Sequence, residues 1–114
     1  MQDCIFCKIA KKEIKSEVVY EDDTVLAFRD LNPQAPLHVL VVPKKHIATI
    51  NDIEEKDEAL VGHMLYIAGK IAKQEKTADN GYRAVFNVNK DAGQTVFHLH
   101  LHVLGGRVFG WPPG

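Results

Sequence analysis

Three histidines near the C-terminal end alternate with apolar residues, at positions 98, 100 and 102 of a 114-residue chain. On a β-strand this spacing places His98, His100 and His102 on one face, while Leu99 and Leu101 face the core. At a rise of ~3.3 Å per residue, the outer two histidines lie roughly 13 Å apart at the backbone. A zinc–nitrogen bond is only about 2.0–2.1 Å, so one metal ion can bind two neighbours but hardly all three. The sequence therefore predicts that the three histidines divide their functions.

A second chemical pattern stands near the N-terminus, where Cys4 and Cys7 form a Cys-x-x-Cys pair. Two thiolates at this spacing are a good half-site for zinc, and two imidazoles would complete a tetrahedral Cys2His2 set. The candidates for those imidazoles are His38, His46, His63 and the three alternating histidines. A thioredoxin-like redox pair would need a preceding strand, and only three residues precede Cys4. Two unbound thiols without a role remain the alternative.

The alternating histidines also suit catalysis at phosphorus. A neutral imidazole can attack phosphorus or shuttle protons near pH 7. Three imidazoles on one face disfavour simultaneous charging, which helps to keep the central His100 neutral and nucleophilic. The preceding loop offers Gly93, where the backbone can approach a ligand closely, and the donors Gln94 and Thr95. These patterns favour a phosphate- or metal-dependent site over a purely structural role.

Composition limits the classes of protein. The chain is 46% hydrophobic and 25% charged, which is ordinary for a globular protein, and we expect residues 1–114 to form a single domain. A net charge of −1 gives no electrostatic case for binding nucleic acid or a membrane surface. No signal peptide or apolar run of 18 residues is visible, so we expect a cytoplasmic protein.

Hydrophobic periodicity predicts an α+β fold. Strands are expected at 18–20, 25–28, 37–42, 82–88 and 97–104, the first two joined as a hairpin. A main helix is expected to be capped by Asn51 or Asp52 and to end near 74–77. Its apolar stripe consists of Leu60, Met64, Ile67, Ala68 and Ile71. We expect one antiparallel sheet of about five strands, with this helix on one face and a short N-terminal helix. The prolines exclude a helix at 108–114, and the apolar Trp111 favours docking of that tail.

The run from Gly93 to Arg107, which contains His-x-His-x-His, resembles the signature of the histidine triad (HIT) family. The likeness covers nearly the whole chain, including 4–9, 26–30, 43–47 and 81–83. The final Trp-Pro-Pro-Gly is similar to the end of the Hint branch, the histidine triad nucleotide-binding proteins.

This resemblance implies a homodimer whose two sheets join, and hydrolysis of purine nucleotides that carry an amine on the α-phosphate. The expected substrates are adenosine or guanosine 5'-monophosphoramidates, and no cofactor is required for catalysis. His100 would be the nucleophile of a nucleotidyl-histidine intermediate, with His38 supporting it from the neighbouring strand. By the same likeness, structural zinc would be held by Cys4, Cys7, His46 and His98, so that His98 belongs to both the triad and the metal site.

The resemblance also assigns contacts to the nucleotide. The residues implied for the phosphate are His102, Thr95, Asn87 and Gly93, with Gln94 and Val96 beside them. Asp30 would bind the ribose hydroxyls. The residues implied for the base are Ile5, Phe6, Ile9, Phe28 and Leu31. Trp111 belongs to a tail that would approach the partner's active site.

Some positions depart from the family pattern, and two other functions remain open. Thr95 stands where many members have serine, and Gly110 alters the tail, which bears on leaving-group preference. The last histidine, His102, is not the glutamine of the uridylyltransferase branch, which favours hydrolysis over group transfer. One alternative is a purine-nucleotide-binding interaction protein with vestigial catalysis. The other is a zinc-dependent structural module.

Overall fold

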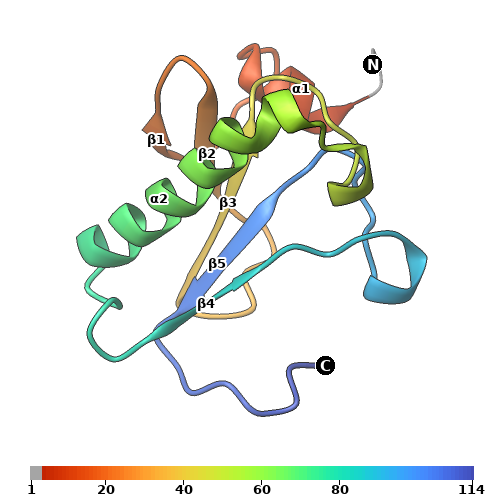
Figure 1. Cartoon of the computed structure of the whole chain (residues 1–114). Helices are drawn as coiled ribbons and strands as arrows, with labels where there is room; N and C mark the ends of the chain where they lie inside the picture. The colour runs from red at the N-terminus through yellow and green to blue at the C-terminus, as the bar shows by residue number, and fades with distance from the viewer. Residues whose placement is uncertain (1–3) are drawn as a thin grey trace.

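The structure, a computed structural model, describes residues 4–114 as an α+β fold (Figure 1). Its elements are α1 (Ile5–Ala10), β1 (Val18–Glu21), β2 (Val25–Arg29), β3 (Leu37–Pro43), α2 (Glu58–Gln74), β4 (Tyr82–Val85) and β5 (Leu101–Gly105). The five strands form one sheet in the order β1-β2-β3-β5-β4, and every neighbouring pair is antiparallel. The predicted five-stranded antiparallel sheet with one main helix and a short N-terminal helix is therefore confirmed.

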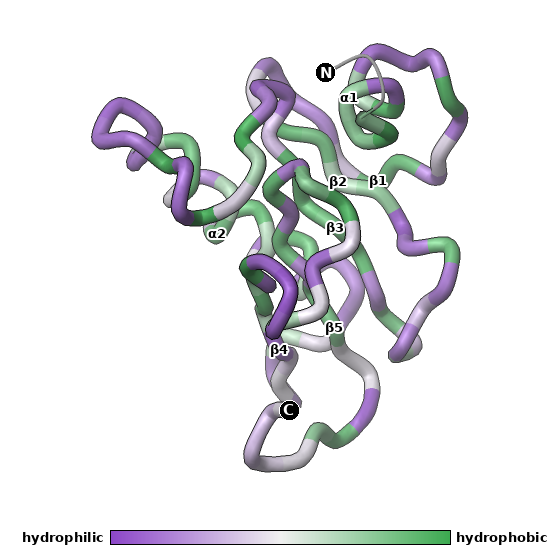
Figure 2. Tube along the Cα trace, turned by 90° about the vertical axis from the view of Figure 1, so that its right-hand side faces the viewer, coloured by the Kyte–Doolittle hydropathy of each residue, from purple (hydrophilic) through white to green (hydrophobic). Residues whose placement is uncertain are grey.

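Both faces of the sheet are covered, which explains why every residue of β3 is buried. On one face, α2 packs Met64 and Ile67 against β-strand residues such as Val39, Val41 and Val103. Figure 1 shows α2 lying across the sheet, and Figure 2 shows hydrophobic segments gathered along β2 and β3, with hydrophilic loops around them. The predicted α2 stripe is thus the core contact of the helix.

The opposite face carries α1 and the chemistry. Phe6 and Ile9 of α1 pack on Leu26, Phe28, Leu40 and Val42. Because strand side chains alternate between faces, His38 shares this face with Leu40, and His102, opposite Leu40 in the β3–β5 register, does too.

Among the described residues, no helix combines the length and the apolar character that spanning a lipid bilayer requires.

The main helix begins later than the sequence predicts. Thr49, not Asn51 or Asp52, caps the first turn, and Asp52 closes a capping box with it. A second single turn at 55–57 follows, and Asp57 accepts from the Glu54 backbone and from the Lys45 ammonium. Residues 50–57 therefore form two 3-10 turns, and α2 starts only at Glu58. Its end at Gln74 agrees with the prediction.

The strands at 82–88 and 97–104 are both shorter than predicted. Pairing between β3 and β5 begins at Val41 opposite Leu101. Two residues further along the same register, Leu99 would face Pro43, which has no backbone N–H to donate, and Leu99 N instead donates to Ile47 O at 2.6 Å. His98 and His100 thus lie in an extended segment before β5, and only His102 is on the strand. The pairing of β4 with β5 also ends at this residue, with Val85 opposite His102.

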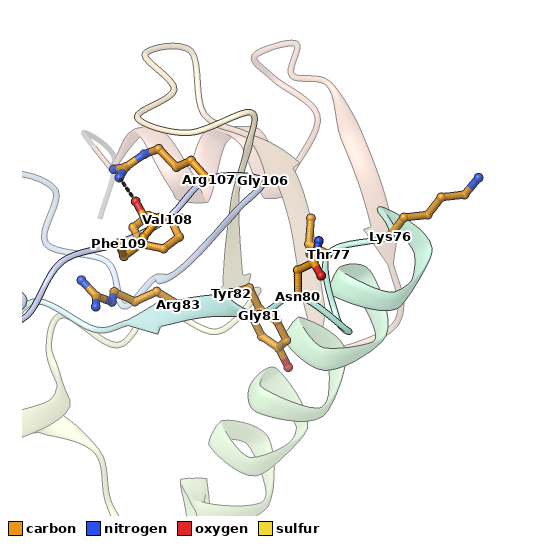
Figure 3. A pocket seen from close by; sticks show the side chains of 10 residues that line it. All are labelled: Lys76, Thr77, Asn80, Gly81, Tyr82, Arg83, Gly106, Arg107, Val108 and Phe109. Atoms are coloured by element: carbon orange, nitrogen blue, oxygen red, sulfur yellow. Dashed lines mark hydrogen bonds between the residues drawn. The ribbon is translucent and has the colours of Figure 1, made fainter.

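Trp111 does not pack against its own chain, since it is 85% exposed, so its expected docking stays a prediction that concerns a partner. The preceding Phe109 is held between the guanidinium groups of Arg83 and Arg107, 5.2 and 4.2 Å from its ring centroid (Figure 3). Arg83 also donates to the carbonyl of Gly110. Arg83, Arg107 and Phe109 line a cavity of about 620 Å³ beside β4. No histidine or cysteine is among the residues that line this cavity.

The packing of α2 predicts a contrast between two adjacent residues. Met64→Ala is expected to lower the free energy of unfolding by about 2–5 kcal/mol, because Met64 is fully buried and truncation leaves a cavity. Leu65→Ala, at a position that is 50% exposed, is expected to lower it by less than about 1 kcal/mol. Urea denaturation of both variants measures the difference, and equal losses would contradict this packing.

Candidate functional site at the histidine cluster

The proton on His100 is placed by the backbone. Its Nδ1 lies 2.7 Å from the carbonyl oxygen of His98. A carbonyl only accepts hydrogen bonds, so Nδ1 carries the proton and Nε2 keeps a free lone pair. Burial lowers the pKa of His100 below its usual value, which keeps the ring neutral. The result is an imidazole with an unprotonated Nε2.

A chain of hydrogen bonds places the proton of His102 on Nε2, whereas the proton of His100 is on Nδ1. The backbone N–H of Gln34 donates to His38 Nδ1 at 3.0 Å, so the proton of His38 is on Nε2. That Nε2 lies 2.9 Å from His102 Nδ1, which must accept. The proton of neutral His102 is therefore on Nε2. Burial, with His100 and His38 nearby, lowers the pKa of His102 to about 4.

The position of His38 differs from the sequence-based expectation. His38 was expected to support His100, but within residues 4–114 its ring hydrogen-bonds to His102 and none joins it to His100. The register explains this, because His102 is opposite Leu40, which places His38 diagonally across from it on the same face. The Asp30 carboxylate lies 3.5 Å from His38 Nε2 on the other side.

One cavity of about 300 Å³ opens onto these histidines. His100 and His102 line it together with most of the side chains that the sequence assigned to a nucleotide. Those residues are Ile5, Phe6, Ile9, Phe28, Asp30, Leu31, Thr95 and Val96. The apolar wall is oriented by aromatic contacts, since the Phe6 ring meets His100 edge-on at 5.1 Å and Phe28 at 5.5 Å.

Four predicted residues do not line this cavity: Asn87, Gly93, Gln94 and Trp111. Gln94 has a different function, because its amide nitrogen donates to the carbonyls of Ala48 and Val96 and its oxygen accepts from Asn89 N. Both amide hydrogens are thus used inside the protein, and Gln94 braces the loop instead of offering a donor to a ligand.

Five lining residues escaped the sequence analysis: Ile14, Lys15, Ser16, Arg29 and Leu40. Leu40 could have been found, because it is two residues from His38 and shares its face of β3. The segment from 14 to 16 carries no motif. It reaches the cavity because the chain returns from α1 toward β1, where Arg29 N bonds to Glu17 O.

The second cluster is formed by Cys4, Cys7, His46 and His98, whose ligand atoms all lie within 4.8 Å of one another. His98 Nδ1 is 3.2 Å from Cys4 Sγ, 3.4 Å from Cys7 Sγ and 3.2 Å from His46 Nδ1. His46 Nδ1 is 3.3 Å from Cys7 Sγ. Tetrahedral zinc with bonds of about 2.0–2.3 Å separates its ligand atoms by about 3.3–3.8 Å, so the set fits such an ion.

The environment of His98 supports this fit. Its Nε2 lies 2.7 Å from the carbonyl of Pro43, so Nε2 carries the proton and Nδ1 presents a lone pair to the cluster. Burial lowers the pKa of His98 to about 4 and raises that of Cys7. Deep burial thus favours a neutral imidazole, while a thiolate here needs a neighbouring positive charge such as a metal ion.

Asp30, His38 and His102 also bring ligand-type atoms within 4.8 Å of one another. In this group the protonation pattern opposes metal binding. His38 Nδ1 accepts from Gln34 N, so the nitrogen facing the group, Nε2, carries a proton and has no free lone pair. His38 and His102 therefore form a hydrogen-bonded pair, with the Asp30 carboxylate 3.5 Å from His38 Nε2.

The lowered pKa of His102 predicts a pH-dependent stability. In the unfolded chain this histidine has a pKa of about 6.5, against about 4 when folded. Between those values the unfolded state binds the extra proton, so stability is lost as the pH falls from about 6.5 toward 4. His102→Gln is expected to reduce the loss between pH 7 and pH 5 by about 1–2 kcal/mol, measured by urea denaturation at both pH values. An unchanged pH dependence would contradict this burial of a neutral His102.

Comparison with known proteins identifies the family of this chain. The HIT domain family model matches residues 11–109. The purine nucleoside phosphoramidase of Escherichia coli K12 is 49% identical over 109 residues, which is 96% of this chain and 92% of that protein. A HIT family hydrolase from Legionella pneumophila Philadelphia 1 superposes with a TM-score of 0.96 at 56% identity, over 98% of this chain and all of that one. A histidine triad protein from Clostridium difficile gives 0.93 at 51% identity, over 96% of each. The chain belongs to the HIT family.

Proposed function

We propose that this protein is a hydrolase of purine nucleoside 5'-monophosphoramidates. The observation that carries the proposal is the hydrogen bond from His100 Nδ1 to the His98 carbonyl, which leaves an unprotonated Nε2 on a residue that lines the cavity. The 49% identity to the E. coli purine nucleoside phosphoramidase supports the choice of substrate. We further propose that residues 1–114 form a single HIT domain.

In the proposed reaction, His100 Nε2 attacks the α-phosphorus. A nitrogen–phosphorus bond forms to the enzyme while the bond from phosphorus to the amine breaks. The departing amine takes its proton from solvent water, while the Nε2–H of neutral His102 donates a hydrogen bond to a phosphate oxygen. Water then attacks the phosphorus of the nucleotidyl-histidine, the phosphorus–nitrogen bond to His100 breaks, the attacking water gives a proton back to solvent, and a nucleoside 5'-monophosphate leaves.

The rest of the cavity suits the nucleotide. The Thr95 hydroxyl belongs to the lining of the same cavity as the histidines and would bind a phosphate oxygen, and the Asp30 carboxylate can accept from ribose hydroxyls. Ile9, Phe6 and Phe28 form the apolar wall that would enclose the base. His38 acts as a positioning residue, because its hydrogen bond sets which nitrogen of His102 holds the proton.

We also propose that Cys4, Cys7, His46 and His98 bind one structural zinc ion, which needs both cysteines as thiolates in a reducing compartment such as the cytoplasm. The four ligands join α1 to the segments that follow β3 and precede β5. Bound zinc would fix these segments to one another, and His100 and Phe6 lie beside its ligands.

A homodimer is part of the proposal. β4 is an edge strand, and its outer backbone groups are available to extend the sheet across a second copy. The contacts of Phe109 with Arg83 and Arg107 hold the tail beside this edge, with Trp111 exposed. Trp111 would then contact the partner's nucleotide site, where it would influence which amine is accepted as leaving group.

Removal of the nucleophile provides the first test. His100→Ala is expected to lower kcat on an adenosine phosphoramidate by at least about 10³-fold, since no other free imidazole nitrogen is expected to replace it. Steady-state release of a fluorescent amine measures the rate. AMP binding, followed by calorimetry, is expected to persist because the apolar wall is unchanged.

His63→Ala is the matched control, since His63 is on α2 and pairs with Asp22, away from the cavity. It is expected to retain wild-type kcat. Wild-type turnover by His100→Ala would refute the nucleophile assignment. A wild-type protein that binds AMP but turns over no phosphoramidate would instead be a nucleotide-binding module with vestigial catalysis.

The metal proposal predicts a stoichiometry and a loss of stability. The purified protein is expected to bind one zinc ion per chain, measured by elemental analysis, and Cys4→Ser with Cys7→Ser to bind none. Zinc removal is expected to lower the melting temperature by several degrees, because bound metal stabilises only the folded state. A wild-type chain that binds no zinc, or retains it without both thiols, would contradict this ligand set.

A further inference from the structure

We propose that metal binding and nucleotide binding are thermodynamically coupled in this chain, through His98 and Phe6. The inference rests on the proposed nucleotide and zinc sites and adds a dependence between them. Each ligand is inferred to raise the affinity of the chain for the other, so the Cys/His cluster would control the nucleotide cavity as well as stabilise the fold.

His98 belongs to both sites. Its ring presents Nδ1 to the metal cluster, 3.2 Å from both Cys4 Sγ and His46 Nδ1. Its backbone carbonyl accepts a hydrogen bond from His100 Nδ1 at 2.7 Å, which is the contact that orients the nucleophile. If the His98 ring shifts when the metal is released, the shift also affects the backbone carbonyl of His98, which fixes the His100 tautomer.

Helix α1 forms the second connection. Cys4 is the N-cap of α1 and Cys7 lies in its first turn, while Phe6 and Ile9 of the same helix line the nucleotide cavity. A helix this short is not stable on its own, so its position depends on what anchors it. The anchors are the apolar contacts of Phe6 and Ile9 with the sheet, and the metal cluster.

Phe6 brings the two connections together. Its ring centroid is 6.0 Å from that of His98, a proposed metal ligand, and 5.1 Å from that of His100, both in edge-on geometry. Neighbouring Phe28, at 5.5 Å, continues the contact into the cavity wall. An apolar ring packed between a metal ligand and the nucleophile transmits a change in α1 directly to the nucleotide site.

The metal is expected to change the strength of the anchor. Without a cation, the cluster has only weak thiol–imidazole contacts of 3.2 to 3.4 Å. A bound cation replaces these with four coordinate bonds, which hold α1 against the histidine segment. Nucleotide bound beneath Phe6 and Ile9 holds α1 in the same place, so the two ligands stabilise one arrangement.

Coupling of this kind is reciprocal, because the factor by which zinc tightens AMP must equal the factor by which AMP tightens zinc. We expect a factor of about ten, within the range usual for linked sites. Zinc affinity is measured by competition with a chromophoric chelator, with and without saturating AMP. AMP affinity is measured by calorimetry on the zinc-loaded and zinc-free protein. Both readouts are equilibrium constants and need no turnover.

A pair of matched variants tests the route. Phe6→Leu is expected to keep zinc binding but to reduce the coupling factor to below about threefold, because the edge contacts with His98 and His100 are lost. Phe86→Leu makes the same chemical change beside the core cluster that includes Met64 and Val103, away from the nucleotide cavity, and is expected to retain the full factor.

The outcomes separate this inference from the proposed function. Equal zinc affinities with and without AMP, in a protein that binds AMP, would overturn the coupling and leave the proposed function standing. Absence of AMP binding to the zinc-loaded protein would overturn both. Coupling that persists in Phe6→Leu would overturn the Phe6 route. Loss of the far-ultraviolet helix signal on zinc removal would also overturn the Phe6 route, because the metal would then control the whole fold.

Discussion

The hydrogen bond from His100 Nδ1 to the His98 carbonyl is the contact on which the site depends. It exists because the chain is outside the β-ladder at this point. Pairing of β5 with β3 and β4 starts only at Leu101 and His102, so the His98 carbonyl is available to a side chain. The cause lies on the neighbouring strand, where Pro43 has no N–H with which to continue the ladder. The missing backbone donor at Pro43 of β3 thus helps to decide which ring nitrogen of His100, 57 positions later, carries the proton.

The two faces of the sheet divide structure from chemistry. On one face, α2 and the strands bury a continuous apolar core that includes Met64 and Val103. On the other, a six-residue helix with two thiols covers only part of the sheet, and the cavity opens beside it onto His100 and His102. Burial on this face keeps the imidazoles neutral, which is the state that nucleophilic attack requires.

Local sequence patterns predicted what depends on local geometry. The alternation of histidines, the hairpin, the apolar stripe of α2 and the Cys-x-x-Cys pair follow from side-chain periodicity and spacing. The structure shows the predicted hairpin, the predicted stripe and the predicted face of the histidines. Features set by contacts between distant segments were wrong or missed. Asp57 of the second 3-10 turn is bound by Lys45, and the side-chain amide of Gln94 donates to the carbonyls of residues 48 and 96. Lys15 and Ser16 reach the cavity by the path of a loop that carries no motif.

The most direct test of the account is to look for the covalent intermediate. The protein would be mixed with excess adenosine phosphoramidate, quenched within a single turnover, and analysed by intact-protein and peptide mass spectrometry. The account predicts one adenylyl group per chain, attached to His100 and absent from His100→Ala, because only that imidazole presents a free Nε2 to the cavity. Rapid turnover with no adduct, or an adduct on His102, would contradict the assignment of the nucleophile.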